Sequence, residues 1–61
     1  MNIQSFTGKN VRAVCKNGKI YEGMVQVYFD EDSTNQYVMA FKTGKWIVEI
    51  PEDELAKVEL I

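Results

Sequence analysis

The sequence predicts an all-β domain: a small, strongly bent antiparallel barrel of five strands with one 3₁₀ turn before the last strand. Three observations lead to this prediction. Short segments of alternating apolar and polar residues, rich in β-branched and aromatic side chains, are separated by tight-turn sequences. The longest segment is interrupted by Gly23, where a strand without a Cβ can bend sharply. The chain of 61 residues is too short for a second layer around such a sheet.

The composition describes one small domain spanning residues 1–61. A chain of this size buries only about 60% of the surface that its unfolded form exposes, so self-association is a common way to gain stability. The single cysteine, Cys15, cannot form an internal disulfide, and the lack of histidine argues against a zinc site. We therefore expect no metal and no cofactor, and either a reducing compartment or indifference to redox state.

The charge balance bears on partners and location. A net charge of −2 and a pI near 4.9 lack the basic footprint that duplex DNA requires. The N-terminal segment MNIQSFTGKN has no basic start, apolar run or small-residue cleavage site, so we expect no secretory signal. No stretch approaches the roughly 18 to 20 apolar residues of a membrane span. We expect a cytoplasmic protein with neither a membrane nor a duplex-DNA partner.

The first two strands are expected over residues 9–16 and 19–29. The turn between them contains Asn17-Gly18, and Asn-Gly is the strongest short-range hairpin signal. Before these strands, Ile3 and Phe6 are three positions apart, so one helical turn would lay both over the open end of the barrel. A partly ordered tail is the alternative for this segment.

The type of this first turn decides which side chains face the interior. A two-residue turn would put Glu22 on the face that carries the apolar residues of the first strand. A three-residue loop, with Gly18 as a left-handed bulge, shifts the pairing by one residue and buries no Glu or Gln. We therefore prefer the three-residue loop. Its inward residues are Val11, Ala13 and Cys15 on the first strand and Tyr21, Gly23, Val25, Val27 and Phe29 on the second.

Three further strands follow. A polar loop over residues 30–35 leads to a strand at 36–42, a turn at Thr43-Gly44 leads to a strand at 45–50, and the last strand is expected at 56–60. The inward face of the third strand is ambiguous, because Tyr37, Met39 and Phe41 compete with Val38 and Ala40. The fourth strand has Trp46, Val48 and Ile50 on one side, and the fifth is expected to turn Ala56, Val58 and Leu60 inward.

Pro51 separates the last two strands. Proline cannot continue a strand ladder, and the acidic residues that follow it suit one turn of 3₁₀ helix.

Two stretches resemble the signatures of the Sm and Sm-like proteins. GKNVRAVCKNGKIYEG, followed by an acidic turn and Asn35, is similar to the first signature, with its alternating apolar residues, Lys-Asn-Gly-type turn and aromatic residue two before a glycine. VEIPEDELAKVEL is similar to the second signature, in which an apolar residue and a short turn precede a strand that closes on a Val-Glu pair. The resemblance covers about residues 8–60. Its motifs are short, so another small SH3-like barrel is the alternative.

The resemblance implies a ring of six or seven copies, in which the fourth strand of one subunit pairs with the fifth of the next, and a uridine-preferring RNA site inside the ring. Asp30 would correspond to the family's acid, and Asn35 to its base-contacting asparagine. The spacing between them is one residue longer than usual, so either the loop bulges or Glu31 replaces the acid. Ile50-Pro51 stands where the second signature has Arg-Gly, and the long N-terminal helix is missing. The resemblance therefore supports the family's fold and assembly for this chain more strongly than it supports RNA binding.

In the preferred register, several apolar side chains point outward, which on so small a body predicts a contact surface for another protein chain. These residues are Val14, Ile20, Met24, Tyr28 and Ile47. Pairing of open sheet edges between copies would cover this surface as well. We expect the oligomer interface to include Met24, Tyr28, Lys45, Ile47, Glu49 and Val58.

Lysines at the two hairpin tips are the candidate contacts for single-stranded RNA. Lys16 and Lys19 flank the first turn, and Lys42 and Lys45 flank the turn at Thr43-Gly44. Together with nearby tyrosines they would offer stacking and phosphate contacts. The preferred interpretation is that lysines at strand ends prevent edge-to-edge aggregation. The candidate RNA contacts are Tyr28, Asp30, Asn35 and Lys45.

The sequence does not predict an enzyme. Cys15 has no histidine to activate it, and the acidic residues at 30–32 and 52–54 lie in solvated turns rather than in a cleft that would separate their pKa values. The acidic loop also lacks the glycine and the final glutamate of an EF-hand. We expect a non-enzymatic, homo-oligomeric Sm-like module that contacts single-stranded RNA, or alternatively an SH3-like adaptor that binds another protein.

Overall fold

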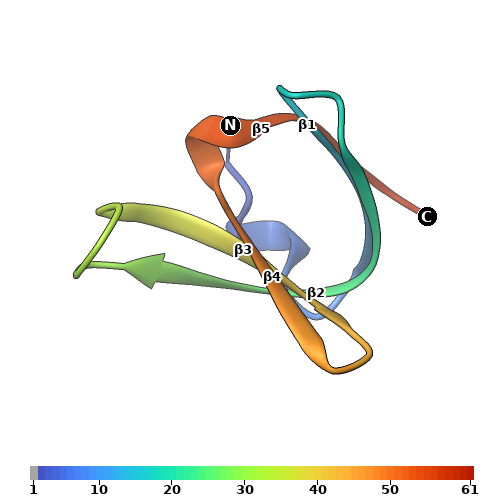
Figure 1. The fold of residues 1–61 in the computed structure, drawn as a ribbon, viewed down its shortest axis with the longest axis horizontal. Coiled ribbons are helices and arrows are strands. Elements are labelled where there is room, and N and C mark those ends of the chain that lie inside the picture. The colour runs from blue at the N-terminus through green and yellow to red at the C-terminus, as the bar shows by residue number, and fades with distance from the viewer. Residues whose placement is uncertain (1) are drawn as a thin grey trace.

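The computed structural model describes residues 2–61, which form one curled antiparallel sheet of five strands (Figure 1). The elements are η1 (Gln4–Phe6), β1 (Asn10–Cys15), β2 (Ile20–Asp30), β3 (Gln36–Thr43), β4 (Trp46–Pro51), η2 (Glu52–Glu54) and β5 (Leu55–Leu60). The strand order is β4-β3-β2-β1-β5. The predicted all-β fold, with a 3₁₀ turn before the last strand, is confirmed. Within the described residues no helix is long and apolar enough to cross a membrane.

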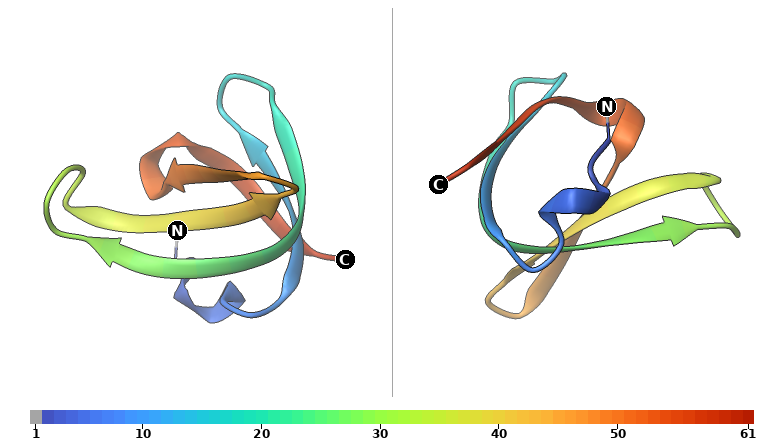
Figure 2. Two further views of the ribbon diagram at one scale, coloured as in Figure 1. Left: turned by 60° about the horizontal axis from the view of Figure 1, so that its bottom comes forward. Right: turned by 180° about the vertical axis from the view of Figure 1, so that it is seen from behind.

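Strand β2 bends at Gly23 and so belongs to both halves of the sheet (Figure 2). Its residues up to Met24 pair with β1, whereas those from Val25 onward pair with β3. Gly23 has a φ of +145°, a conformation that residues with a Cβ rarely adopt. A Cβ added there would lie 4.0 Å from Cδ2 of Phe41, so backbone conformation rather than lack of space requires glycine.

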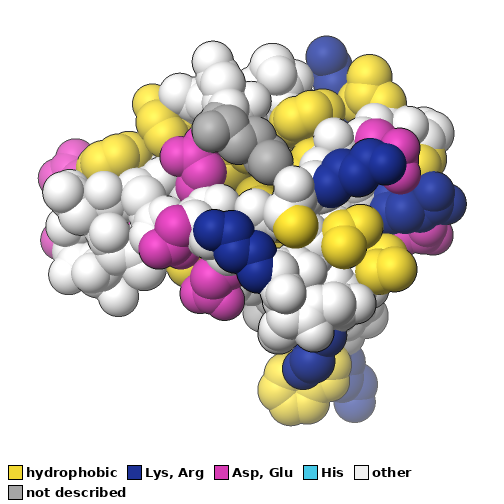
Figure 3. Space-filling model, turned by 90° about the horizontal axis from the view of Figure 1, so that it is seen from above, with side chains coloured by type: hydrophobic (Ala, Val, Ile, Leu, Met, Phe, Trp, Pro, Cys, Tyr) yellow, Lys and Arg dark blue, Asp and Glu magenta, His cyan; other side chains and the backbone are white. Residues whose placement is uncertain are grey.

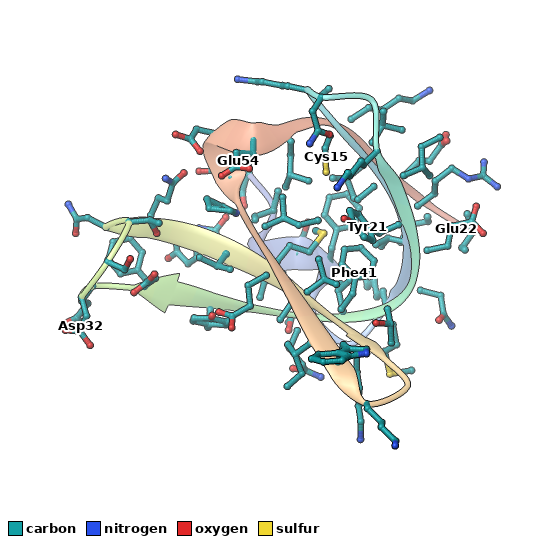
Figure 4. All side chains as sticks on the ribbon, in the orientation of Figure 1. Cys15, Tyr21, Glu22, Asp32, Phe41 and Glu54 are labelled. Atoms are coloured by element: carbon teal, nitrogen blue, oxygen red, sulfur yellow. The ribbon has the colours of Figure 1, made fainter. Side chains whose placement is uncertain are left out.

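The first hairpin has the predicted register. Ala13 lies opposite Tyr21, and Val11 lies opposite Gly23. Gly18 closes the three-residue loop with a φ of +88°, and its N–H donates to the carbonyl of Cys15 at 2.9 Å. Figure 4 shows the consequence: the labelled Tyr21 points into the curl of the sheet, toward Phe41, while the neighbouring Glu22 points away from it.

The core lies inside the curl and is closed at one end by η1. Ile3 is fully buried, and Phe6 packs against the core, so the predicted helical turn is confirmed over the partly ordered tail. Met39 and Phe41 are buried in the same cluster, which resolves the inward face of β3. The aliphatic residues buried with them are Val11, Ala13, Val25, Ile50 and Leu55.

The prediction for β5 was partly wrong because this strand contains an irregularity. Val14 pairs with Lys57, but the next residue of β1, Cys15, pairs with Leu55, so Ala56 is an extra residue. The shift turns Leu55 inward, where it is 4% exposed, and leaves Ala56 exposed. A bulge of one residue inverts the alternation of faces, so a strictly alternating pattern misplaces both residues.

Two side chains that were predicted to face inward, Leu60 and Phe29, are nevertheless exposed, and so is Trp46 on the fourth strand. Leu60 lies opposite Val11 on the expected face, but it is 59% exposed. Phe29, opposite Tyr37, is 45% exposed because the hairpin of β2 and β3 extends past the rest of the sheet (Figure 1). Trp46 shares its face with Val48, as expected, yet at the end of β4 it is 75% exposed.

Two methionines on opposite faces test the sheet register. Met39→Ala should lower the free energy of unfolding by about 2–5 kcal/mol, because Met39 is fully buried. Met24→Ala, at a side chain that is 57% exposed, should cost less than about 0.5 kcal/mol in the monomer. Urea unfolding followed by circular dichroism measures both. Equal losses from the two substitutions would contradict the register.

Candidate functional site

The end of the hairpin formed by β2 and β3 is organised by Asp30. Its Oδ1 accepts hydrogen bonds from the N–H groups of Asp32 and Ser33, both at 3.2 Å. Its Oδ2 accepts from the N–H of Thr34 at 3.4 Å and from the Thr34 hydroxyl at 3.2 Å. A short acidic side chain that accepts from the following backbone is the usual way to fold such a loop. The structure therefore gives Asp30 a role in shaping the loop.

These hydrogen bonds change the acidity of Asp30. Partial burial acts to raise the pKa of this carboxyl group, but the bonds from Ser33, Thr34 and Asp32 outweigh it and hold the pKa below its ordinary value of 3.8. Hydrogen bonds to the charged form of an acid favour that form. Asp30 is consequently ionised at neutral pH and places a negative charge at the base of the loop.

Beside Asp30, the same hairpin end carries an asparagine and an aromatic pair. Asn35 has a φ of +54°, the left-handed conformation that asparagine tolerates better than most residues. The rings of Phe29 and Tyr37 pack edge to face, with centroids 5.1 Å apart and an interplanar angle of 79°. Because Phe29 is only half-buried, this pair presents aromatic surface next to Asn35.

The outer face of β2, β3 and β4 forms an apolar surface with a groove in it. Ile47 is 64% exposed and Met24 57%. The groove has a volume of about 410 Å³ and is lined by Met24, Gln26, Ala40, Lys42 and Ile47. These residues are neighbours because Gln26 pairs with Ala40 across β2 and β3, while Lys42 pairs with Ile47 across β3 and β4. The sequence prediction of an outward apolar surface is thereby supported for these strands.

On the same outer face, Tyr28 of β2 and Glu49 of β4 are joined by a hydrogen bond. The Tyr28 hydroxyl donates a hydrogen bond to the Glu49 carboxylate. This bond, with smaller contributions from burial and from the charges of Glu49 and Asp30, raises the pKa of Tyr28 to about 12. Tyr28 is therefore a neutral donor at physiological pH, held by Glu49.

The two sheet edges are the third candidate contact. Within residues 2–61, β4 pairs only with β3, and β5 pairs only with β1, so each has one side without a strand partner. Both edges carry a large exposed apolar side chain, Trp46 on β4 and Leu60 on β5. An open edge with exposed apolar side chains is a template for pairing with another chain.

The predicted site residues fall into separate groups. Asp30 and Asn35 lie in the same loop region at one end of β3, whereas Lys45 lies in the turn at its other end. Figure 1 shows these two hairpin ends on different sides of the molecule. Met24, Tyr28, Ile47 and Glu49 share the outer face, and Val58 lies half-buried on β5. Sequence reasoning missed the Phe29–Tyr37 surface, because alternation assigned Phe29 to the core.

On the face that Figure 3 shows, lysine and arginine side chains are interspersed with acidic ones rather than gathered into one basic region. On the outer face of β1, the Arg12 guanidinium contacts Glu22 and Glu59, so its charge is matched locally. Within the described residues, no group of three His, Cys, Asp or Glu side chains could hold a metal ion.

Cys15 is the last residue of β1, at the base of the first hairpin loop, and its side chain is buried among core residues. Burial raises the pKa of its thiol, the nearby charge of Glu54 raises it further, and Lys19 lowers it. Figure 4 shows Cys15 and Glu54 at the same end of the molecule. At neutral pH this thiol is protonated and acts as a small core side chain.

Comparisons of the chain with protein-family models, curated proteins and solved structures gave no match.

The loop role of Asp30 predicts a pH dependence of stability. Because its folded pKa is below 3.8, the carboxylate stabilises the fold above that pH, and this contribution is lost as pH falls from 3.8 through the folded pKa. Asp30→Asn should therefore flatten the acid limb of the stability curve, measured by urea unfolding from about pH 6 to pH 2. Asp32→Asn, in the same loop, is the matched control and should retain the wild-type slope. Identical curves for wild type and Asp30→Asn would contradict this role.

Proposed function

We propose that this chain is a non-enzymatic binding module that self-associates by pairing β4 of one copy with β5 of the next. The observation that carries the proposal is that both ends of the curled sheet are free edges. A contact between two different edges is heterologous, so repeated copies form either a closed ring or an open filament. The resemblance to Sm-like proteins suggests the same arrangement.

The side chains at the two edges are complementary. Trp46 and Val48 share the inner face of β4, and Val58 and Leu60 share the inner face of β5. An antiparallel register that puts Val48 opposite Val58 of the next copy also puts Trp46 opposite Leu60. Val48 and Val58 are half-buried, whereas Trp46 and Leu60 are largely exposed. Pairing would cover all four side chains. Burial of these side chains adds an apolar contribution to the backbone hydrogen bonds.

The assembly should be visible in solution. At micromolar concentration the wild-type chain should sediment as a species several times its 7.0 kDa mass. Leu60→Lys should weaken the assembly about tenfold or more, because a lysine cannot be buried against Trp46 without losing hydration. Ser33→Lys, which adds the same charge at an exposed residue of the loop between β2 and β3, is the control.

Tryptophan fluorescence gives a second measure of the same contact. Trp46 is the only tryptophan in the chain, and its emission should shift to shorter wavelength as protein concentration rises. A folded 7.0 kDa monomer with unchanged emission at these concentrations would overturn the proposal.

A second candidate function, binding of single-stranded RNA, is supported by the hairpin end. The half-exposed Phe29–Tyr37 pair offers a ring on which a base could stack, and Asn35 beside it carries an amide that could bond a base edge. The acidic residues Asp30, Glu31 and Asp32 in the same loop oppose binding of phosphate. We therefore rank RNA binding below self-association.

A uridine-rich oligonucleotide tests this second function at low salt. Asn35→Gly should weaken binding about tenfold while preserving the left-handed backbone, because glycine also adopts that conformation. Ser33→Ala, in the same loop, should leave affinity unchanged. Absence of binding by the wild type at low salt would remove the RNA function, and capture of a protein partner without RNA would favour the adaptor function.

A further inference from the structure

The outer face of β2, β3 and β4 presents opposite charges around a small central residue. Ala40 occupies the centre, paired with Gln26 on β2 and with Glu49 on β4. One step along the strands lies Lys42, paired with Ile47. The positive and the negative side chain thus lie next to Ala40 in two different directions, Lys42 along β3 and Glu49 across to β4.

The apolar residues of this face lie around the same centre. Met24 and Ile47 are more than half exposed, and both line the groove that passes over Ala40. Tyr28 lies beyond Gln26 on β2 and is 41% exposed. A groove with a small residue at its centre and larger apolar side chains at its rim has the shape of a docking surface.

Both charges on this face are available to a partner. Among residues 2–61, neither Lys42 nor Glu49 takes part in an intramolecular ion pair. Glu49 accepts a hydrogen bond from Tyr28, which holds the carboxylate over the outer face. A partner that fits must therefore supply an anion opposite Lys42, a cation opposite Glu49, and apolar surface between them.

A second copy of the chain meets these requirements. We propose that this outer face pairs with the same face of another copy about a two-fold axis, with Lys42 of each copy bonded to Glu49 of the other. The axis runs in the plane of contact along the line from Ile47 through Ala40 to Tyr28. Each of these three residues then faces its own counterpart, and the rotation exchanges the positions of Lys42 and Glu49.

The proposed contact resembles a known class of face-to-face packing between two β-sheets. An axis along this diagonal makes the strands of the two copies cross at a large angle, close to the orthogonal class of face-to-face sheet packing. The contact is isologous, so each copy contributes the same surface, and it forms a pair rather than a filament. The other two simple axes fail, because rotation about the strand direction sets Lys42 against Lys42, and rotation across the strands sets Glu49 against Glu49.

This pairing is independent of the edge contact under "Proposed function", because it uses outward side chains rather than the free backbone groups of β4 and β5. Where the two-fold axis lies perpendicular to the axis of an edge-linked ring, face pairing joins two rings and doubles the mass. The small area of three short strands indicates a weak, salt-sensitive pair, below the size of a standard stable interface.

Charge exchange tests the two-fold pair in the full chain. Lys42→Glu and Glu49→Lys should each weaken the pair about tenfold or more. Each substitution replaces both symmetry-related ion pairs with two side chains of the same charge. The double variant should restore pairing to within about threefold of wild type, because the ion pairs re-form with reversed sign. Sedimentation equilibrium over a range of protein and salt concentrations measures the association constant. Circular dichroism confirms that each variant is folded.

Two further variants separate the face contact from the edge contact and from a general effect of net charge. Lys16→Glu makes the same charge change at the first hairpin, away from the face, and should leave pairing unchanged. Leu60→Lys, which targets the edge, should reduce a doubled assembly to isolated pairs and leave the association constant of the face contact unaltered. Failure of the double variant to recover, or wild-type pairing in both single variants, would overturn the proposal. Binding of a different protein to this face while the wild-type chain does not pair would overturn it too.

Discussion

The whole structure depends on the register of the first hairpin, and that register depends on one left-handed residue. With Gly18 as the third residue of the loop, Ala13 faces Tyr21 and the inner faces of β1 and β2 coincide. A shift of one residue would put Glu22 inside the curl and Tyr21 in solvent. In a chain whose core is built from ten buried side chains, such an exchange could not be compensated elsewhere.

The second constraint is the bend in β2, which makes one strand serve two halves of the sheet. Val25 is the first residue to pair with β3, directly after the last pairing with β1. Beyond Met24, where the pairing of β2 with β1 ends, the N-terminal segment forms hydrogen bonds to the same edge of β2. The N–H of Gly8 donates to the carbonyl of Val25 at 2.8 Å, and the Thr7 hydroxyl accepts from the N–H of Val27 at 3.1 Å. This explains why a segment without strong periodicity is ordered, with Ile3 in the core.

Local chemistry in the sequence was sufficient to predict the five strands to within about one residue and the register of the first hairpin, because glycine residues mark the turns and the bend. Pro51, which was expected to lie outside the sheet, is the last residue of β4 and pairs with Val38. Local chemistry was insufficient where tertiary context decides. The extra residue at Ala56 has no signal of its own, since neither glycine nor a polar residue marks it. The exposure of Phe29 depends on how far one hairpin extends beyond the others, which alternation does not encode. The groove over Ala40 required the pairing of three strands, although its members Met24 and Ile47 were predicted to face outward.

The irregularity in β5 has a consequence for how far the sheet can grow. Strands that lie flat and regular at an edge recruit copies of themselves and lead to amyloid-like aggregates. Here the edge is regular only beyond Ala56, and η2 ends immediately before Leu55, so a visiting strand finds a short regular stretch bounded by a helical turn. Lys57 lies in that stretch and is exposed, and its charge disfavours the in-register addition of identical strands at this edge. The bulge therefore acts as a barrier to uncontrolled polymerisation, while leaving room for one specific partner strand.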